Sequence, residues 1–318
     1  MVFLRCSLHQ AGSEFFWPVI MQLHLFGALT PTGEAFRQLF FSSHSTYSLF
    51  AYSRRDPSLL EVDFHDPRAF TPGGESGAPS LWISFGPIWL FASFLDQLSL
   101  EHPERLKNLR GVIACSSSSA ITKRFAANRF DRELVSRLTA SEDQLRSTCR
   151  RLALSCCILR PTLIYGRLGA FSDRNISRLI VLMRRMPFLP LPAHTGMRQP
   201  IHASQLAAVV LELLCHFTSG SSEPSLPELI SLGGDSELSY TAMLRAIQQS
   251  LPLGDSACRC RLISVPNRLF FAAAAPLLLH SPKAFEAVLR MGSDLSGFIP
   301  AHKLLKTNPQ PFPVLPLL

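Results

Sequence analysis

The sequence is poor in lysine and tyrosine, two residue types that often work together in acid–base catalysis. Its 318 residues include four tyrosines and only five lysines. No tyrosine is followed by a lysine four residues later. Residues four apart share one face of a helix, where an ammonium group lowers the pKa of a phenol and makes it a general acid or base near neutral pH. The sequence therefore excludes catalysis by a Tyr-x-x-x-Lys pair on any of its helices.

The sequence also lacks the patterns of a metal site and of a membrane span. Its eight cysteines include one close pair, Cys258 and Cys260, without the second pair or the histidines that a zinc site needs. We therefore expect no metal, and we expect reduced thiols in a cytoplasmic protein. No stretch reaches the roughly 18 apolar residues of a membrane span. The longest apolar runs, 81–95 and 269–279, are each broken by a proline.

Positive charge comes mainly from arginine. The net charge is +8 and the isoelectric point is near 9.3. Because arginine grips phosphate and carboxylate groups bidentately, the composition favours an anionic small molecule as ligand. Nucleic acid is not expected, since the arginines are scattered rather than gathered in a basic block with interleaved aromatics. With 47% hydrophobic and 17% charged residues, the chain has enough material for a large α/β core.

The first twenty residues differ from the rest of the chain. A signal peptide would need basic residues, an uninterrupted apolar core and small residues at a cleavage site, and residues 1–20 do not show this order. Met21 directly precedes the first convincing strand. We therefore expect residues 1–20 to form an N-terminal extension that is disordered or results from a mis-assigned start codon.

A strand, a glycine turn and a helix open the remaining sequence. The strand is predicted at 23–26 and the helix at 34–41, and the turn between them contains Gly27 and Gly33. This order is typical of a dinucleotide-binding unit, in which the helix amides face a pyrophosphate. An ordinary strand-to-helix turn remains the alternative.

The second predicted strand, 47–53, indicates which dinucleotide is preferred. It is followed by Arg54 and Arg55. An acidic residue at this strand end binds the ribose hydroxyls of NAD, whereas arginines suit the 2′-phosphate of NADP. The sequence therefore favours NADP over NAD, with two solvent-exposed arginines as the alternative.

The stretch Cys156–Gly166 reads Cys-Cys-Ile-Leu-Arg-Pro-Thr-Leu-Ile-Tyr-Gly. An apolar run that ends in polar residues and a turn is typical of a buried parallel strand that brings groups to a site at its carboxyl end. The stretch resembles the Leu-Arg-Pro-x-x-x-Tyr-Gly segment of the extended short-chain dehydrogenases, the NAD-dependent epimerase/dehydratase family. The nucleoside-diphosphate-sugar epimerases are the group within this family that it resembles most.

The resemblance implies positions for the cofactor. The glycine turn of this family usually has three glycines, and Thr30 stands here in place of the middle one. Because that glycine lets the backbone approach a phosphate closely, Thr30 puts cofactor affinity in doubt. The cofactor-binding residues implied by the turn and by the family pattern are Gly27, Thr30, Gly33, Arg54, Arg55, Asp63, Gly86, Pro161 and Tyr165.

The resemblance also implies a catalytic serine. Relatives have a serine-rich run after the strand that is predicted here at 111–115, and one of its hydroxyls hydrogen-bonds the reacting oxygen. In the run Ser116–Ser119 we expect Ser118 to take this role by its position. A run of serines is also an ordinary polar strand end, so this alternative stays open.

The Tyr-x-x-x-Lys pair of relatives lies on the next helix, predicted at 131–150. Aligned on Ser141-Glu142, the two positions are occupied by Leu134 and Leu138. Lys123, Arg137 and Glu142 are candidates for a replacement proton-transfer group, and surface charges on an amphipathic helix are the alternative.

Three residues of the second half match positions that contact the substrate in relatives. Arg174 and Asn175 open a helix near the nucleotide diphosphate, where a plain helix cap at Asp173 is the alternative. Arg198 lies in Arg-Gln-Pro-Ile-His, which resembles the motif whose arginine reaches the substrate diphosphate. The aspartate that usually follows is Gln205 here.

Together these patterns predict an α/β, doubly wound parallel sheet of the Rossmann type with a smaller C-terminal substrate region. We expect a dinucleotide-binding domain at 21–165 and a mixed substrate-binding region at 166–318, of which 199–234 returns to the Rossmann sheet. Related proteins often dimerise, which implies a homodimer.

Two functions follow from the resemblance. One is an NADP-dependent enzyme that acts on a nucleotide-linked sugar with a replacement base. The other is a non-catalytic dinucleotide-binding sensor or structural subunit, which the missing Tyr-x-x-x-Lys pair favours. A third hypothesis, a protein that docks on membranes through the aromatic run 89–94, rests on that run alone.

Overall fold

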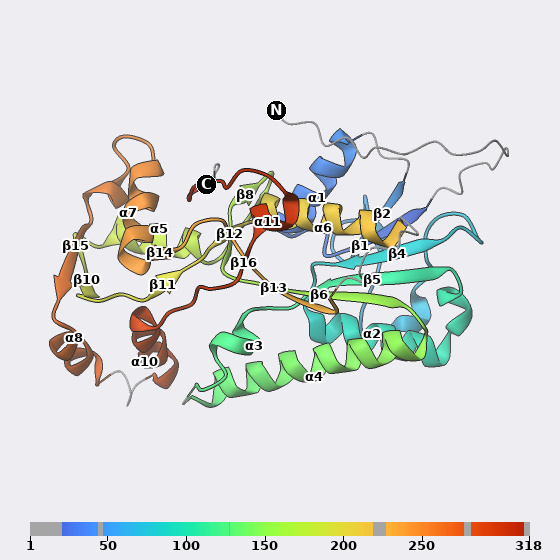
Figure 1. Cartoon of the computed structure of the whole chain (residues 1–318), viewed down its shortest axis with the longest axis horizontal. Coiled ribbons are helices and arrows are strands. Elements are labelled where there is room, and N and C mark those ends of the chain that lie inside the picture. The colour runs from blue at the N-terminus through green and yellow to red at the C-terminus, as the bar shows by residue number, and fades with distance from the viewer. Residues whose placement is uncertain (1–20, 44–46, 127, 219–226, 277–280, 315–318) are drawn as a thin grey trace.

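The computed structural model describes residues 21–43, 47–126, 128–218, 227–276 and 281–314. The expectation for residues 1–20 lies outside these ranges. Figure 1 shows a large sheet with helices on both faces and a smaller lobe at the other end of the long axis. The elements of the two parts alternate along the chain.

The large sheet has eight strands in the order β16-β13-β6-β5-β4-β1-β2-β3, and every neighbouring pair is parallel. Its strands are β1 (Gln22–Phe26), β2 (Ser48–Ser53), β3 (Leu60–Glu61), β4 (Ser80–Ser84), β5 (Leu109–Cys115), β6 (Ser155–Pro161), β13 (Leu229–Gly233) and β16 (Ile299–Pro300). Strands β3 to β6 follow the 3-2-1-4-5-6 order of dinucleotide-binding sheets. The predicted doubly wound parallel sheet is confirmed.

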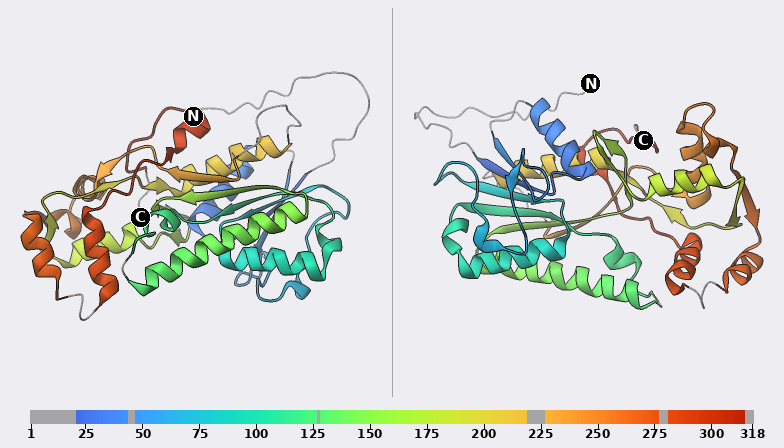
Figure 2. Two further views of the ribbon diagram at one scale, coloured as in Figure 1. Left: turned by 60° about the horizontal axis from the view of Figure 1, so that its bottom comes forward. Right: turned by 180° about the vertical axis from the view of Figure 1, so that it is seen from behind.

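Two helical layers bury this sheet. α2 (Ile88–Glu101) packs with α4 (Arg129–Arg151) on one face, and α6 (Ala203–Thr218) packs with α1 (Pro31–Ser42) and α11 (Ala301–Leu305) on the other (Figure 2). Strands β1 and β4 are buried at every position, because both of their faces are covered. Both strands also bury polar side chains, namely Gln22 and His24 in β1 and Ser80 and Ser84 in β4.

The smaller lobe is built around one strand pair and its own apolar core. β10 (Phe188–Pro192) runs parallel to β15 (Arg261–Val265). The helices of the lobe are α5 (Ile176–Arg185), α7 (Tyr240–Ser250), α8 (Asn267–Ala274) and α10 (Pro282–Leu289). Short elements connect the two parts: α3 (Ser119–Thr122), β7 (Ile164–Tyr165), β8 (Arg167–Leu168), β9 (Phe171–Ser172), β11 (Met197–Arg198), β12 (Ile201–His202) and β14 (Leu238–Ser239).

An ionic cluster joins the smaller lobe to the start of α4. The carboxylate of Asp131 accepts hydrogen bonds from Lys123 Nζ at 2.7 Å and from Arg290 Nη1 at 2.8 Å. Burial raises the pKa of Asp131, but the hydrogen bonds from Lys123 and Asn128 and the charges of Lys123 and Arg290 outweigh it and bring the pKa to about 2. The carboxylate therefore stays ionised at neutral pH and ties α4 to the lobe.

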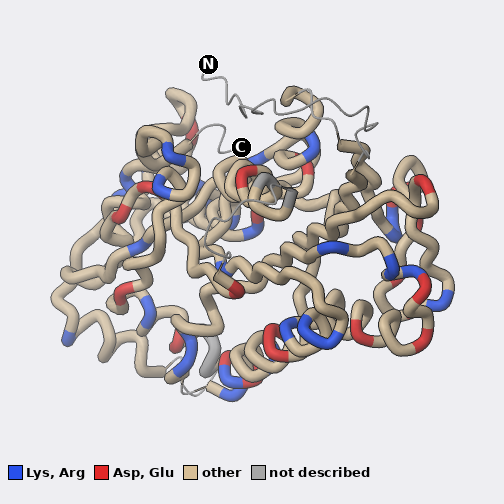
Figure 3. Tube along the Cα trace, turned by 45° about the vertical axis from the view of Figure 1, so that its right-hand side comes forward, with Lys and Arg blue, Asp and Glu red and all other residues tan. Residues whose placement is uncertain are grey.

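Within the described ranges, no helix is both long and apolar enough to cross a membrane. The same ranges hold no group of three or more side chains that could share a metal ion. Figure 3 shows basic and acidic residues interspersed along α4, and basic residues spread over both parts of the molecule.

Candidate functional site

A cavity of about 790 Å³ opens at the carboxyl ends of β1, β4 and β5. Its walls come from the starts of α1 and α2, from one face of α4, and from the connection between β9 and α5. Ligands of open α/β sheets bind outside the carboxyl ends of the strands, where the strand order reverses between β1 and β4. This cavity is therefore the candidate functional site.

The turn between β1 and α1 is shaped by two glycines. Gly27 has a φ of +81°, and a Cβ at this position would lie 2.7 Å from the backbone nitrogen of Gly86. A Cβ on Gly33 would lie 2.3 Å from the carbonyl oxygen of Gly27. Both positions therefore require glycine, and they bring the backbone of β1, α1 and β4 close together beneath the cavity.

Thr30 and Pro31 change what this turn offers to a phosphate. Thr30 is the N-cap of α1: its Oγ1 accepts the N–H of Gly33 at 3.0 Å and donates to the carbonyl of Gly27 at 2.8 Å. Pro31 has no N–H to donate. One first-turn amide is thus occupied and another is absent. The glycine cradle and the cavity fit a dinucleotide, but the turn would offer its diphosphate fewer donors.

The residues predicted for the adenosine side lie outside the cavity lining. Arg54 Nη1 is 3.8 Å from Asp63 Oδ1, and both side chains are exposed, at 57% and 38%. Arg55 is also exposed. Gly86, in contrast, lines the cavity beside Gly27. The structure therefore brings Arg54 and Asp63 together at the ends of β2 and β3, away from the enclosed part of the site.

The side of α4 that lines the cavity has leucines at the two positions that align with the Tyr-x-x-x-Lys pair of relatives. Leu134 and Leu138 both line the cavity. They are one helical turn apart and share a face of α4, as the alignment with the Tyr-x-x-x-Lys positions implies. Neither side chain can transfer a proton. The aliphatic Ile88 and the aromatic Trp89, both from the start of α2, line the same cavity.

Ser116 and Ser117, rather than Ser118, line the cavity. Ser118 is 9% exposed, and its N–H donates to the carbonyl of Pro161 at 2.9 Å. The prediction chose Ser118 by counting along the serine run. Ser116 and Ser117 directly follow the end of β5 at Cys115, where the first residues after a buried parallel strand face the site.

Ser116 belongs to a buried charged group. Its Oγ donates to Glu142, a fully buried carboxylate on α4. Arg160 at the end of β6 pairs with the same carboxylate, with its Nε 2.9 Å from Oε1 and 3.1 Å from Oε2. Glu142 was a candidate proton-transfer group. In the structure this carboxylate pairs with Arg160 and accepts the hydrogen bond of Ser116. It therefore holds Ser116 on the cavity wall.

The opposite wall is the start of α5. Asp173, Arg174 and Asn175 line the cavity there. Asp173 Oδ1 accepts the backbone N–H groups of Asn175 and Ile176, each at 2.7 Å. The carboxylate therefore holds the start of α5, while the exposed guanidinium of Arg174 lies at the cavity and Asn175 Nδ2 donates to the carbonyl of Ile164 at 3.4 Å.

Three further predicted site residues lie apart from the cavity lining. Arg198 is 8% exposed and donates to the carbonyls of Met197, Ser293 and Arg290 at 2.5–2.7 Å. The phenol of Tyr165 is buried, accepts the N–H of Val314 at 2.8 Å, and has its pKa raised by burial. Pro161 is buried at the end of β6. Arg198 and Tyr165 thus hold the lobe and the C-terminal segment in place.

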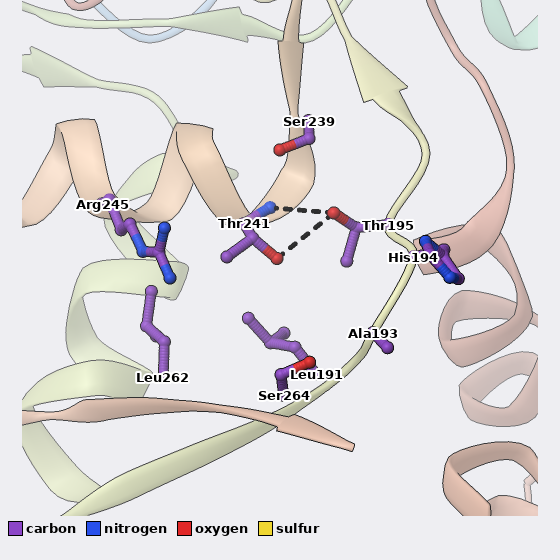
Figure 4. A pocket seen from close by; sticks show the side chains of 9 residues that line it. All are labelled: Leu191, Ala193, His194, Thr195, Ser239, Thr241, Arg245, Leu262 and Ser264. Carbon is purple, nitrogen blue, oxygen red and sulfur yellow. Dashed lines mark hydrogen bonds between the residues drawn. The ribbon is translucent and has the colours of Figure 1, made fainter. Parts of the chain in front are cut away.

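A second, smaller cavity of about 380 Å³ lies in the C-terminal lobe between the β10–β15 pair and the start of α7. In Figure 4 the guanidinium of Arg245 and the hydroxyl of Thr241 face the space between these elements. Thr241 and Thr195 are joined, with their Oγ1 atoms 3.2 Å apart. This cavity shares no lining residue with the larger one.

Comparison with known proteins identifies the fold. The sequence matches no family model, and no curated protein matches it by sequence. Among solved structures, a human epimerase family protein in complex with NADPH has a TM-score of 0.60 and 12% identity, covering 92% of this chain and 96% of that one.

Two bacterial structures are similar to the same degree. A nucleoside-diphosphate-sugar epimerase from Staphylococcus aureus has a TM-score of 0.58 and 13% identity, with 92% and 98% coverage. A UDP-glucuronic acid 4-epimerase from Bacillus cereus, in complex with UDP-glucuronic acid and NAD, has a TM-score of 0.57 and 12% identity, with 91% and 94% coverage. The fold implied by the sequence resemblance is therefore confirmed.

Proposed function

We propose that this chain, which has the fold of NAD(P)-dependent epimerases and dehydratases, binds a nicotinamide dinucleotide in the large cavity without carrying out Tyr–Lys chemistry. One observation carries the second half of the proposal. The two α4 positions that line the cavity one helical turn apart are Leu134 and Leu138. A leucine can neither donate nor accept a proton, so these positions bind but do not catalyse.

The first half is supported by the glycine cradle. Gly27 and Gly33 keep the backbone of the turn close to β4, and α1 directs its N-terminus toward the cavity. A bound dinucleotide would supply hydride transfer. The role of the chain is to bind and orient it, with Ser116 and Ser117 as the hydroxyls on the inner wall.

We propose NADP(H) as the preferred form. Arg54 and Arg55 directly follow β2, where the 2′-phosphate would lie, and both are exposed and accessible to a ligand. In Arg54→Ala we expect the Kd for NADPH to rise about tenfold, which corresponds to about 1.4 kcal/mol, while the Kd for NADH stays within about twofold. Fluorescence titration of both cofactors measures this. Equal weakening of the two would count against a 2′-phosphate contact.

An enzyme acting on a nucleotide-linked sugar is the second candidate. Arg174 and Asn175 favour it, since they bring a cation and an amide to the cavity from the start of α5. Ser117 could hydrogen-bond a reacting oxygen, since it lines the same wall and its Oγ accepts the N–H of Ser119, which leaves its own proton to donate. Incubation of the protein and cofactor with a panel of sugar nucleotides decides between the candidates: turnover supports the enzyme, and cofactor binding without turnover supports a sensor or structural subunit.

A further inference from the structure

Helix α4 packs against β6 through a layer of side chains that contains two cysteines. Leu145 and Cys149 of α4 belong to one apolar cluster. Ile158 of β6 is a member of the same cluster, and Cys156 packs against it. Cys157, between these two strand residues, belongs to the cluster on the opposite face of the sheet, because successive side chains of a strand alternate. The thiols of Cys149 and Cys156 therefore lie in the same layer, between the helix and the strand.

The turn between α4 and β6 fixes one end of this interface. The N–H of Leu154 donates to the carbonyl of Cys149 at 2.8 Å. The N–H of Ala153, which has a φ of +53°, donates to the carbonyl of Arg150 at 3.1 Å. Together these hydrogen bonds form a Schellman motif, in which the chain turns sharply at the end of a helix. Strand β6 begins directly after it, at Ser155, so the chain returns at once along the helix that it has just left.

The ion pair between Glu142 and Arg160 fixes the other end. Arg160 Nε lies 2.9 Å from Glu142 Oε1. Cys149 follows Glu142 on the helix by a rise of about 10 Å. Cys156 precedes Arg160 on the strand by a rise of about 13 Å. Because the helix and the strand run in opposite directions, these similar lengths bring the two cysteines side by side, and their thiols are in hydrogen-bond contact.

The two thiols differ in their access to solvent. Cys149 is fully buried, and both its hydrogen bond with Cys156 and its burial raise the pKa of its thiol, which therefore stays protonated. Cys156 is partly exposed. A small oxidant from solvent therefore meets Cys156 first and has a second thiol directly behind it. A reactive cysteine with a neighbouring thiol that resolves its sulfenic acid is the arrangement that yields a disulfide rather than further oxidation.

We propose that Cys149 and Cys156 are an oxidative modification site, at which hydrogen peroxide converts the two thiols into a disulfide that locks α4 onto β6. The sulfur of Cys156 attacks the peroxide, the O–O bond breaks, and a sulfenic acid and one water form. The sulfur of Cys149 then attacks the sulfenic sulfur, and its proton leaves with the departing hydroxide as a second water. The thiols lose two electrons and the peroxide gains them. Neither cysteine lines the large cavity, so the reaction does not require NADPH.

The test treats the full-length protein with a small excess of hydrogen peroxide, unfolds it in iodoacetamide to block every remaining thiol, and maps its proteolytic peptides by mass spectrometry. We expect the peptide with Cys149 to be joined to the peptide with Cys156, and to separate on reduction. Cys156→Ala should abolish this link. The matched control is Cys157→Ala, which removes the neighbouring thiol on the opposite face and should keep the link. A link that persists in Cys156→Ala would overturn the inference.

The unchanged protein decides the question by itself if a variant does not fold. Oxidation of Cys156 to a sulfinic acid while Cys149 remains a free thiol contradicts the inference. The lock on α4 has a second readout, because a disulfide restricts the unfolded chain. We expect the melting temperature of the linked protein to rise by about 5 °C and to return to its former value on reduction. Equal melting temperatures of the linked and reduced protein would contradict the lock.

Discussion

The Glu142 carboxylate has an ion-pair partner, Arg160, and a hydroxyl donor, Ser116, and all three groups lie between α4 and the ends of β5 and β6. Glu142 is fully buried, and the Arg160 side chain is 15% exposed. Removing one partner of a buried ion pair leaves the other charge without compensation, which costs more than losing the pair as a whole. The pair therefore makes a testable contribution to stability.

We expect Arg160→Met to lower the free energy of unfolding by about 3–5 kcal/mol, because the Glu142 carboxylate is left buried and unpaired. The double variant Arg160→Met with Glu142→Leu should recover much of this loss. Urea denaturation measures both. The control is Arg129→Ala, which breaks an exposed pair with Glu133 and should cost under about 1 kcal/mol. A loss in Arg160→Met no larger than in this control would contradict the buried pair.

His24 on β1 predicts a pH dependence of stability. It is 1% exposed, lies 2.8 Å from the Tyr52 hydroxyl through Nδ1, and burial lowers its pKa from 6.5 to about 4. The unfolded chain therefore binds a proton that the folded protein does not as the pH falls from about 6.5 to 4, and stability decreases over that range. We expect His24 to contribute a loss of up to about 3 kcal/mol.

The measurement is the free energy of unfolding at several pH values between 7 and 4. In His24→Gln the slope between pH 6.5 and 4 should flatten. His65, which is exposed, is the matched control, and His65→Gln should leave the slope unchanged. An identical slope in His24→Gln would show that other groups cause the acid sensitivity.

Single residues were predicted from the sequence with uneven success. The alignment of Leu134 and Leu138 with the Tyr-x-x-x-Lys positions was counted back from Ser141-Glu142 on the family pattern, and both side chains line the cavity. The hydrogen-bond partners of Arg198 could not be predicted from such a pattern, because the carbonyls of Arg290 and Ser293 that accept its hydrogen bonds are over ninety residues further along the chain. A local sequence pattern predicts which face of a helix or strand a residue occupies. It does not predict which distant backbone carbonyls accept the residue's hydrogen bonds.

At the level of elements, the start of α1 decides how well the site binds a diphosphate. Thr30 stabilises the helix by capping it, and the same interaction occupies the Gly33 amide. Pro31 at the first helical position removes another donor. The sequence predicted helix α1 and a weaker affinity of the turn for the cofactor, since Thr30 stands where the motif has its middle glycine. The structure was needed to show the reason, which is that the Thr30 hydroxyl accepts the Gly33 N–H and so keeps it from a phosphate.

We expect the double variant Thr30→Gly with Pro31→Ala to bind NADPH at least tenfold more tightly, or by about 1.4 kcal/mol. Two amides then become free to donate to the diphosphate, while glycine at the N-cap costs the helix only a few tenths of a kcal/mol. Isothermal titration calorimetry gives the affinity and a thermal melt checks folding. As a matched control, Ser239→Gly removes the cap of α7, outside the cavity, and should leave NADPH affinity unchanged. Weaker binding in the double variant would mean that Thr30 itself contacts the ligand.

At the level of the whole molecule, the large sheet was predictable and the smaller lobe was less so. Buried parallel strands are short apolar runs at regular spacing, so β1, β4, β5 and β6 stand out in the sequence. The β10–β15 pair joins segments about seventy residues apart, and β10 contains two prolines. Neither the pairing nor the lobe core that depends on it follows from a local pattern.

The homodimer stays a prediction, and the structure provides a way to test it. The outward face of α4 is polar, with exposed Arg132, Arg137 and Arg150. A four-helix bundle between two copies would have to bury such charges, which is costly unless they are paired. Sedimentation at low and high salt would therefore show whether a dimer forms and whether charge limits it.

The most direct test of the proposed function is a titration of the purified full-length protein with NADPH, followed by addition of a panel of sugar nucleotides. We expect saturable binding, seen as a change in NADPH fluorescence, and no oxidation or reduction of the bound cofactor by any sugar nucleotide. A fluorescence change that is absent even at millimolar NADPH would contradict the dinucleotide site. Oxidation or reduction of the bound cofactor by any sugar nucleotide would contradict a site that binds the dinucleotide without catalysis.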